Sequence, residues 1–310
     1  MDVFAFLNLN ELALGLSNLP MFPYFDMAHY IISVMSLREQ PGVSLSACRS
    51  TGALAVSQRS PFACWFSSML YCFGGAVLSA LMMAEAPVAP LSNTTNLLLA
   101  SLMWYLVFYC PLDLVYSLAS IWPLRLILTS MKEVTRTWKI LGGVTQAGRK
   151  YSDGLFVMIA VGWAKGAGGG LISNFEQLVR GVWKPETNEL LKMSYPTKVT
   201  LLGSVLFSLQ QCRFFPIQTH HLMLIYTLFI VTNKMRMMLT SGSSSYPFSE
   251  LESVLYKTLF VRPLTFSPLN DSTQGSDQTS CTSPKKNGSI SDRKSPDTDQ
   301  RNPEEAKKKD

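Results

Sequence analysis

Charged residues are scarce in this sequence. They make up 15% of its 310 residues, whereas an average soluble domain carries about 25%. Residues 270–310 hold eight basic and eight acidic residues, so the net charge of +6 belongs to the apolar body that precedes them. A body this poor in charge, with apolar runs of spanning length, favours a bilayer over one large soluble core.

Residues suited to catalysis or metal binding are also few. The three histidines (His29, His220 and His221) have no carboxylate or cysteine at metal-ligand spacing, and the six cysteines form no CxxC pair. The sequence contains neither GxSxG nor HExxH. We therefore expect no enzyme, no metal site, no cofactor and no nucleic-acid partner, and we expect the cysteines and histidines to be packing residues.

Apolar segments dominate what is present. Seven of them stand out, at about 20–38, 61–84, 96–118, 123–145, 154–180, 196–215 and 219–240. A bilayer core takes roughly 20 helical residues, so the sequence predicts an all-α membrane protein with seven transmembrane helices over residues 1–240. Residues 241–310 become rich in Ser, Pro, Asp, Thr and Lys, which is typical of a largely disordered tail.

Positive charge predicts the orientation of these segments. The connection between the first two carries three arginines, and residues 180–198 carry four bases. Because cytosolic loops are enriched in Lys and Arg, we expect the N-terminus and residues 85–95 in the lumen. That loop has no Lys or Arg and contains the glycosylation sequon Asn93-Thr94-Thr95, which only lumenal exposure could use. Seven spans then leave the C-terminus in the cytosol.

The C-terminus ends in a lysine cluster. Lys307 and Lys308 stand four and three positions from the end of the expected cytosolic tail. This spacing resembles the dilysine retrieval signal of membrane proteins of the endoplasmic reticulum. The alternative is a cluster that only increases solubility; we favour the retrieval signal.

Short internal matches indicate a duplication. GGAVLS at 74–79 resembles GGGLIS at 168–173, and LLAS at 98–101 resembles LLGS at 201–204. Segments one to three and four to six would then be duplicates, followed by a seventh. Each unit has an odd number of spans, so the second must be inverted relative to the first. Inverted repeats often form a transport pathway at their interface.

The fourth segment has a basic face. Placed on a helix at about 100° per residue, Arg125, Lys132, Arg136 and Lys139 fall within roughly 60° of one another. Such a helix lies at an anionic membrane surface, crosses the bilayer with its bases toward a polar interior, or forms a solvated cytosolic loop. An anionic ligand such as a phosphorylated lipid headgroup would neutralise the bases. Lys132 and Arg136, one turn apart, could hold its phosphate.

Glycines form the second candidate site. They occur as a pair in the second segment and as a crowded run around a lysine in the fifth: Gly74, Gly75, Lys165, Gly166, Gly168 and Gly169. Glycine weakens a helix by about 1 kcal/mol relative to alanine, so these positions are candidates for kinks that open a polar path. The alternative is close helix packing.

Longer motifs point to a known family. They are FGG at 73–75, CPLDL at 110–114, MKEVTRTWK at 131–139, GWAKGAGG at 162–169, NFE at 174–176 and WKPE at 183–186. In these motifs, from about residue 11 to 240, the chain resembles the trimeric intracellular cation channels, and their type B branch in particular. Residues 48–58 are longer than the family's first cytosolic connection, and the tail lies outside the resemblance.

The resemblance implies a homotrimer of seven-helix subunits in the endoplasmic or sarcoplasmic reticulum membrane. Each subunit would conduct mainly potassium and supply counter-charge during calcium release. The family's KEV-x-R motif implies that Lys132 and Arg136 bind phosphatidylinositol 4,5-bisphosphate, and the glycines match its kinked second and fifth helices. A secondary transporter built on inverted repeats, or a lipid-binding scaffold without conduction, are the alternatives from other functional classes.

Overall fold

The computed structural model describes residues 9–40, 52–181 and 185–240, together with 253–254 and 257–258. All of these belong to one compact unit, Met1–Val261. Apart from the four isolated positions, the expected tail lies outside the described residues, and so do Lys307 and Lys308.

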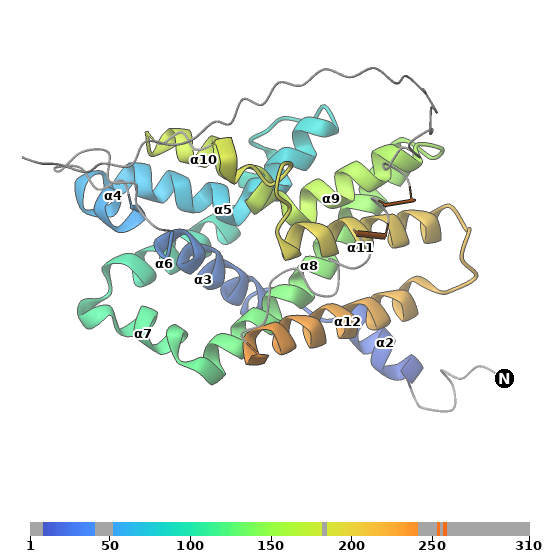
Figure 1. Cartoon of the computed structure of the whole chain (residues 1–310), viewed down its shortest axis with the longest axis horizontal. Helices are drawn as coiled ribbons and strands as arrows, with labels where there is room; N and C mark the ends of the chain where they lie inside the picture. Colours follow the sequence, from blue (N-terminus) through green and yellow to red (C-terminus); the bar gives the residue numbers. More distant parts are fainter. Residues whose placement is uncertain (1–8, 41–51, 182–184, 241–252, 255–256, 259–310) are drawn as a thin grey trace, which may run out of the picture. The chain divides into compact units, whose positions relative to one another are not determined.

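The described residues form α-helices joined by short 3-10 turns (Figure 1). The helices are α2 (Leu9–Ser17), α3 (Tyr24–Arg38), α4 (Ala53–Arg59), α5 (Pro61–Met82), α6 (Thr94–Tyr109), α7 (Leu114–Ser120), α8 (Trp122–Lys150), α9 (Leu155–Leu171), α10 (Ser173–Val179), α11 (Tyr195–Gln211) and α12 (Thr219–Thr240). The turns are η1 (Ala89–Leu91), η2 (Pro111–Asp113) and η3 (Pro185–Thr187). Each of the seven predicted segments contains a helix, whereas α2 and α4 were not predicted.

Fewer helices meet the length and composition of a membrane span. In the described ranges these are α5, the α9–α10 pair and α12, and the bent pair α6–α7 makes a fourth if it counts as one span. Helices α3 and α11 are short, with 15 and 17 residues. At 29 residues α8 measures about 44 Å, but its basic face makes it too polar for this criterion. Length and composition alone therefore do not establish seven spans.

The third predicted segment is not one straight helix. Its two parts, α6 and η2 with α7, are bent by 96°. Pro111 cannot continue the hydrogen bonding of a helix, and Leu112 and Asp113 have positive φ angles of 59° and 51°. Arg38 of α3 supports the bend, because it forms an ion pair of 2.8 Å with Asp113 and its guanidinium lies 4.1 Å from the ring centroid of Tyr116.

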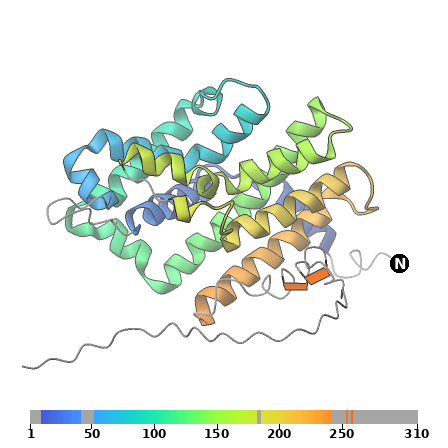
Figure 2. The ribbon, with the colours of Figure 1, turned by 45° about the horizontal axis from the view of Figure 1, so that its top comes forward.

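The helices pack around two hydrophobic clusters. One is built mainly from α3, α5 and α6, and the other from α8, α9, α11 and α12. Helix α8 contacts α3 on one side and α9, α11 and α12 on the other, and α5 contacts α9. Figures 1 and 2 show α8 running through the middle of the helical region, between these two groups. The basic face of α8 therefore lies at the junction of the two halves.

Candidate functional site

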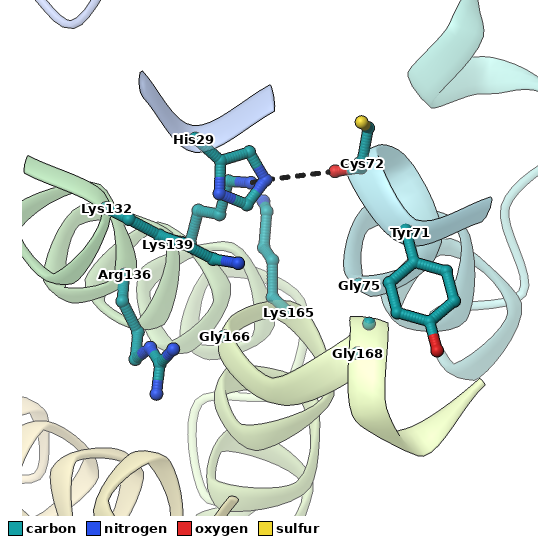
Figure 3. A pocket seen from close by; sticks show the side chains of 11 residues that line it. His29, Tyr71, Cys72, Gly75, Lys132, Arg136, Lys139, Lys165, Gly166 and Gly168 are labelled. Carbon is teal, nitrogen blue, oxygen red and sulfur yellow. Dashed lines mark hydrogen bonds between the residues drawn. The ribbon is translucent and has the colours of Figure 1, made fainter. Parts of the chain in front are cut away.

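A narrow cavity lies where α3, α5, α8 and α9 meet (Figure 3). Its volume is about 30 Å³, which is room for water molecules rather than for a lipid headgroup. The lining residues come from all four helices: His29, Tyr71, Cys72, Gly75, Lys132, Arg136, Lys139, Lys165, Gly166, Gly168 and Gly169.

Most of the candidate residues meet at this cavity. Lys132, Arg136 and Lys165 line it, as do four of the five candidate glycines. Gly74 does not; a Cβ at that position would instead meet the side chain of Ile172. Arg125, the first base of the predicted stripe, lies further along α8 and pairs with Glu39 at 2.7 Å. The basic face therefore turns inward over residues 132–139 and not over its full length.

Arg136 is the most buried base of the cavity. Its side chain is 8% exposed and its Nε lies 3.3 Å from Oε2 of Glu133, whose side chain is 2% exposed. Its Nη1 also donates to the carbonyl oxygen of Pro196 at 3.2 Å. Glu133 pairs with only one of the four bases of the predicted basic face, Arg136. For Lys132, no hydrogen bond or ion pair is found among the described residues.

Lys139 contacts a histidine. Its Nζ lies 2.7 Å from Nε2 of His29, which is itself 3.2 Å from the carbonyl oxygen of Cys72. A neutral imidazole nitrogen either donates or accepts a hydrogen bond. Nε2 therefore cannot accept from Lys139 and donate to Cys72 at the same time. The contact between Lys139 and His29 joins α8 to α3 at the narrow cavity.

The glycines of α5 and α9 lie inside continuous helices and form the crossing between them. A Cβ on Gly168 would come closer than 3.0 Å to the backbone of Gly75, and a Cβ on Gly75 would meet the carbonyl oxygen of Lys165 equally closely. Close backbone approach of this kind needs residues without side chains. The helical break falls later, at Ile172 between α9 and α10.

Lys165 faces a second and wider cavity as well. Its Nζ donates to Oε1 of Gln146 on α8 at 2.9 Å. The wide cavity has a volume of about 370 Å³ and is lined by α3, α5, α6, α8 and α9 together with the α5–α6 connection. Cys72, Lys139 and Lys165 line both cavities, so the two adjoin at these side chains.

A buried ion pair is linked to the narrow cavity through Tyr71. Glu176 of α10 is fully buried and accepts two hydrogen bonds from Arg180, at 2.6 and 2.9 Å. Arg180 also donates to Gln40 at 2.5 Å, and Gln40 donates to the hydroxyl of Tyr71, which lines the cavity. Lys165 and Glu176, which share the fifth predicted segment, therefore have separate partners.

The sequence interpretation missed several lining residues. His29 was expected to be a packing residue, and Tyr71, Cys72 and Gln146 were not singled out. A histidine and an aspartate one turn apart in an apolar segment, at 26 and 29, were the available signal for α3. Nothing in the sequence of α8 distinguishes Gln146 from an ordinary polar residue.

The basic motif and the glycine crossing lie within a region that matches a known protein family. The family model described as "TRIC channel" matches residues 50–241, more than half of the sequence. The chain belongs to the TRIC channel family. This match confirms the predicted family. TRIC channels are multi-pass membrane proteins that conduct cations within the cell.

Curated TRIC proteins are similar over most of their length. A "Trimeric intracellular cation channel type B" from Danio rerio is 84% identical over 265 residues, covering 86% of this chain and 88% of the relative. The Homo sapiens protein of the same description is 52% identical over 251 residues, covering 81% and 82%.

Solved TRIC structures agree with the fold. One, described as "Structural basis for activity of TRIC counter-ion channels in calcium release", has a TM-score of 0.70 and 59% identity and covers 75% of this chain and 99% of its own. A "Trimeric Intracellular Cation channel from C. elegans with bound Ca2+" has a TM-score of 0.66 and 35% identity, covering 76% and 97%.

Proposed function

We propose that this chain forms a potassium-conducting channel of the endoplasmic or sarcoplasmic reticulum, which supplies counter-ions during calcium release. The similar structure described as a counter-ion channel in calcium release supports this assignment. In the proposal three copies assemble, and each contains its own path. The observation that carries it is the pair of adjoining polar cavities between α3, α5, α8 and α9, which in the proposal form the route inside each subunit.

The proposed membrane arrangement has seven spans: α3, α5, α6 with α7, α8, α9 with α10, α11 and α12. The first three and the next three are the inverted repeats. The division of the hydrophobic residues into two clusters, one in each half, supports two repeats. In this arrangement the N-terminus and the α5–α6 connection are lumenal, the C-terminus is cytosolic, and Lys307 and Lys308 act as the retrieval signal.

We further propose that Lys132 and Arg136 bind phosphatidylinositol 4,5-bisphosphate. Three bases of α8 line the narrow cavity, while Glu133 compensates only Arg136. A buried base costs roughly 2.5–3.5 kcal/mol on insertion scales, so an anionic headgroup beside Lys132 would relieve that cost. At its present volume of about 30 Å³ the cavity has room only for water molecules, and the phosphate would therefore widen it. Four of the five candidate glycines, all except Gly74, border the path at this point.

Planar-bilayer recording of the purified protein tests the channel. Unitary potassium currents support it, whereas slow gradient-coupled flux without unitary events would indicate the secondary transporter. A protein that binds the lipid but conducts nothing would be the scaffold.

Two variants test the lipid site. Lys132→Met removes only Lys132, the base for which no ion pair is found among the described residues. Lys132→Ala/Arg136→Ala removes both bases of the proposed site. Each should weaken binding to vesicles containing phosphatidylinositol 4,5-bisphosphate, by about tenfold for the single variant, and alter channel opening. The control Arg59→Ala/Lys192→Ala removes two exposed bases outside the cavity. Unchanged lipid binding in both test variants would refute the assignment.

A further inference from the structure

The wide cavity has a different charge pattern from the narrow one. Its lining includes the carboxylates of Asp26 and Glu85 in addition to Lys139 and Lys165, whereas the narrow cavity has bases and no acid in its lining among the described residues. In the proposed orientation the wide cavity faces the lumen. A cation that enters there meets acids first and lysines at the junction. The groups that position the two lysines and offset their positive charge should therefore affect cation conduction.

Lys165 is linked to Glu85 by one glutamine. Nε2 of Gln146 donates to both carboxylate oxygens of Glu85 at 3.1 Å, and Oε1 of Gln146 accepts from Nζ of Lys165 at 2.9 Å. A carboxylate only accepts and an ammonium only donates, while an amide does both. The amide therefore has one orientation that satisfies both neighbours, and in it the positive end of its dipole faces Glu85 and the negative end faces Lys165.

The backbone of Glu85 is fixed independently of its side chain. Its N–H donates to the carbonyl of Ala80 at 2.8 Å, and Ala84, with a φ of 55°, donates to Leu81 at 3.1 Å. This is the Schellman arrangement that ends many helices. Lys150 at the end of α8 adds a hydrogen bond of 2.5 Å to the carbonyl of Met83. The end of α5 thus presents Glu85 to Gln146 across the mouth of the cavity.

We propose that Glu85 determines cation selectivity at the wide cavity by compensating Lys165 and positioning it through Gln146. The inference rests on the proposed channel function. With Glu85 present, the ammonium of Lys165 is held at the α8 wall and its charge is offset. Without it, an uncompensated positive charge stands where the two cavities adjoin, and it repels potassium and attracts chloride. The carboxylate acts through Lys165, so the effect of Glu85 on cation selectivity depends on the presence of that lysine.

Ion permeability measured in planar bilayers tests this dependence. Glu85→Gln should lower the potassium-to-chloride permeability ratio about threefold, since one unit charge beside a hydrated path is lost. Gln146→Leu keeps both charges but removes the link, and it should lower the ratio as well. The double variant Glu85→Gln/Lys165→Met should restore the ratio to near that of the wild type. A carboxylate that acted only through its own field would leave the ratio of Gln146→Leu at the wild-type value, because both charges remain in that variant.

Matched controls separate this effect from others. Asp153→Asn removes an exposed acid in the α8–α9 turn, close in the chain to Lys150, and should leave the ratio unchanged. Glu85 is exposed, and we expect the melting temperature of Glu85→Gln to equal that of the wild type. An unchanged ratio in Glu85→Gln, or a double variant as unselective as the single one, would overturn the inference. A wild-type protein without unitary currents would instead overturn the proposed channel function.

Discussion

Glu133 and Arg136 form a buried ion pair inside a helix that is otherwise marked by its bases. Glu133 is 1% exposed, and the pair lacks the alignment of a hydrogen bond although the charged atoms are 3.3 Å apart. Burial of two charges is offset only partly by their attraction. The pair therefore adds little net stability, but either member alone would be costly.

Loss of Glu133 alone should strongly destabilise the protein. We expect Glu133→Gln to lower the free energy of unfolding by about 3–5 kcal/mol, because Arg136 is left buried without its acid. SDS titration of the detergent-solubilised protein measures this. Glu133→Gln/Arg136→Gln should recover much of the loss, and Glu186→Gln, an exposed acid, should have no effect. Equal stability of the single and double variants would contradict this account.

At the scale of elements, the contact between α5 and α9 depends on glycine. Gly75 and Gly168 bring the two backbones together without side chains between them. The crossing forms a wall of the narrow cavity, because both glycines line it. A change in the spacing of α5 and α9 at this contact would therefore also change the width of the narrow cavity.

Alanine at this crossing should separate the helices. Gly75→Ala places a Cβ closer than 3.0 Å to the backbone carbonyl of Lys165, which cannot move aside. We expect a loss of about 1–3 kcal/mol in the free energy of unfolding. Gly142→Ala on α8 is the control, since its Cβ meets only the end of Lys165 at 4.0 Å; helix propensity should make it neutral or stabilising. Similar stability of the two variants would show that the crossing tolerates a methyl group.

For the whole molecule, the proposed orientation assigns each end of the helices to one compartment. Arg59, at the end of α4, and Ser92, just before α6, are both exposed and lie toward opposite ends of α5 along the chain. In the proposal Arg59 is cytosolic and Ser92 lumenal.

Cysteine labelling tests this orientation. In intact microsomes, a membrane-impermeant maleimide should label Arg59→Cys, whereas Ser92→Cys should be labelled only after permeabilisation. The wild type gives the background, because Cys110 and Cys212 are partly exposed, Cys64 and Cys72 are buried, and Cys48 and Cys281 lie outside the described residues. The reverse pattern would invert the assignment, and with it the side from which Glu85 is reached.

Periodicity and composition predicted a helix in each of the seven apolar segments and a basic face on α8, since both depend on residues close in the chain. They left the inward orientation of that face as one of three alternatives. Pro61 marks the first residue of α5, as its lack of an N–H allows. The contacts of the site could not be predicted in this way. Lys139 and His29 are 110 positions apart, and nothing local to either identifies the other. The 96° bend depends on Arg38 from another helix as well as on Pro111.

The bare contact between Gly75 and Gly168 also has a mechanical consequence. Two backbones in direct contact lose dispersion attraction when they separate, but without side chains they have no ridges that interlock and resist turning. The crossing should therefore resist relative rotation of α5 and α9 less than a contact between large side chains would. Leu155, at the far end of α9, lies about 20 Å along the axis from Gly168. A small rotation of α9 about this crossing would therefore shift its far end much more than the residues that line the narrow cavity.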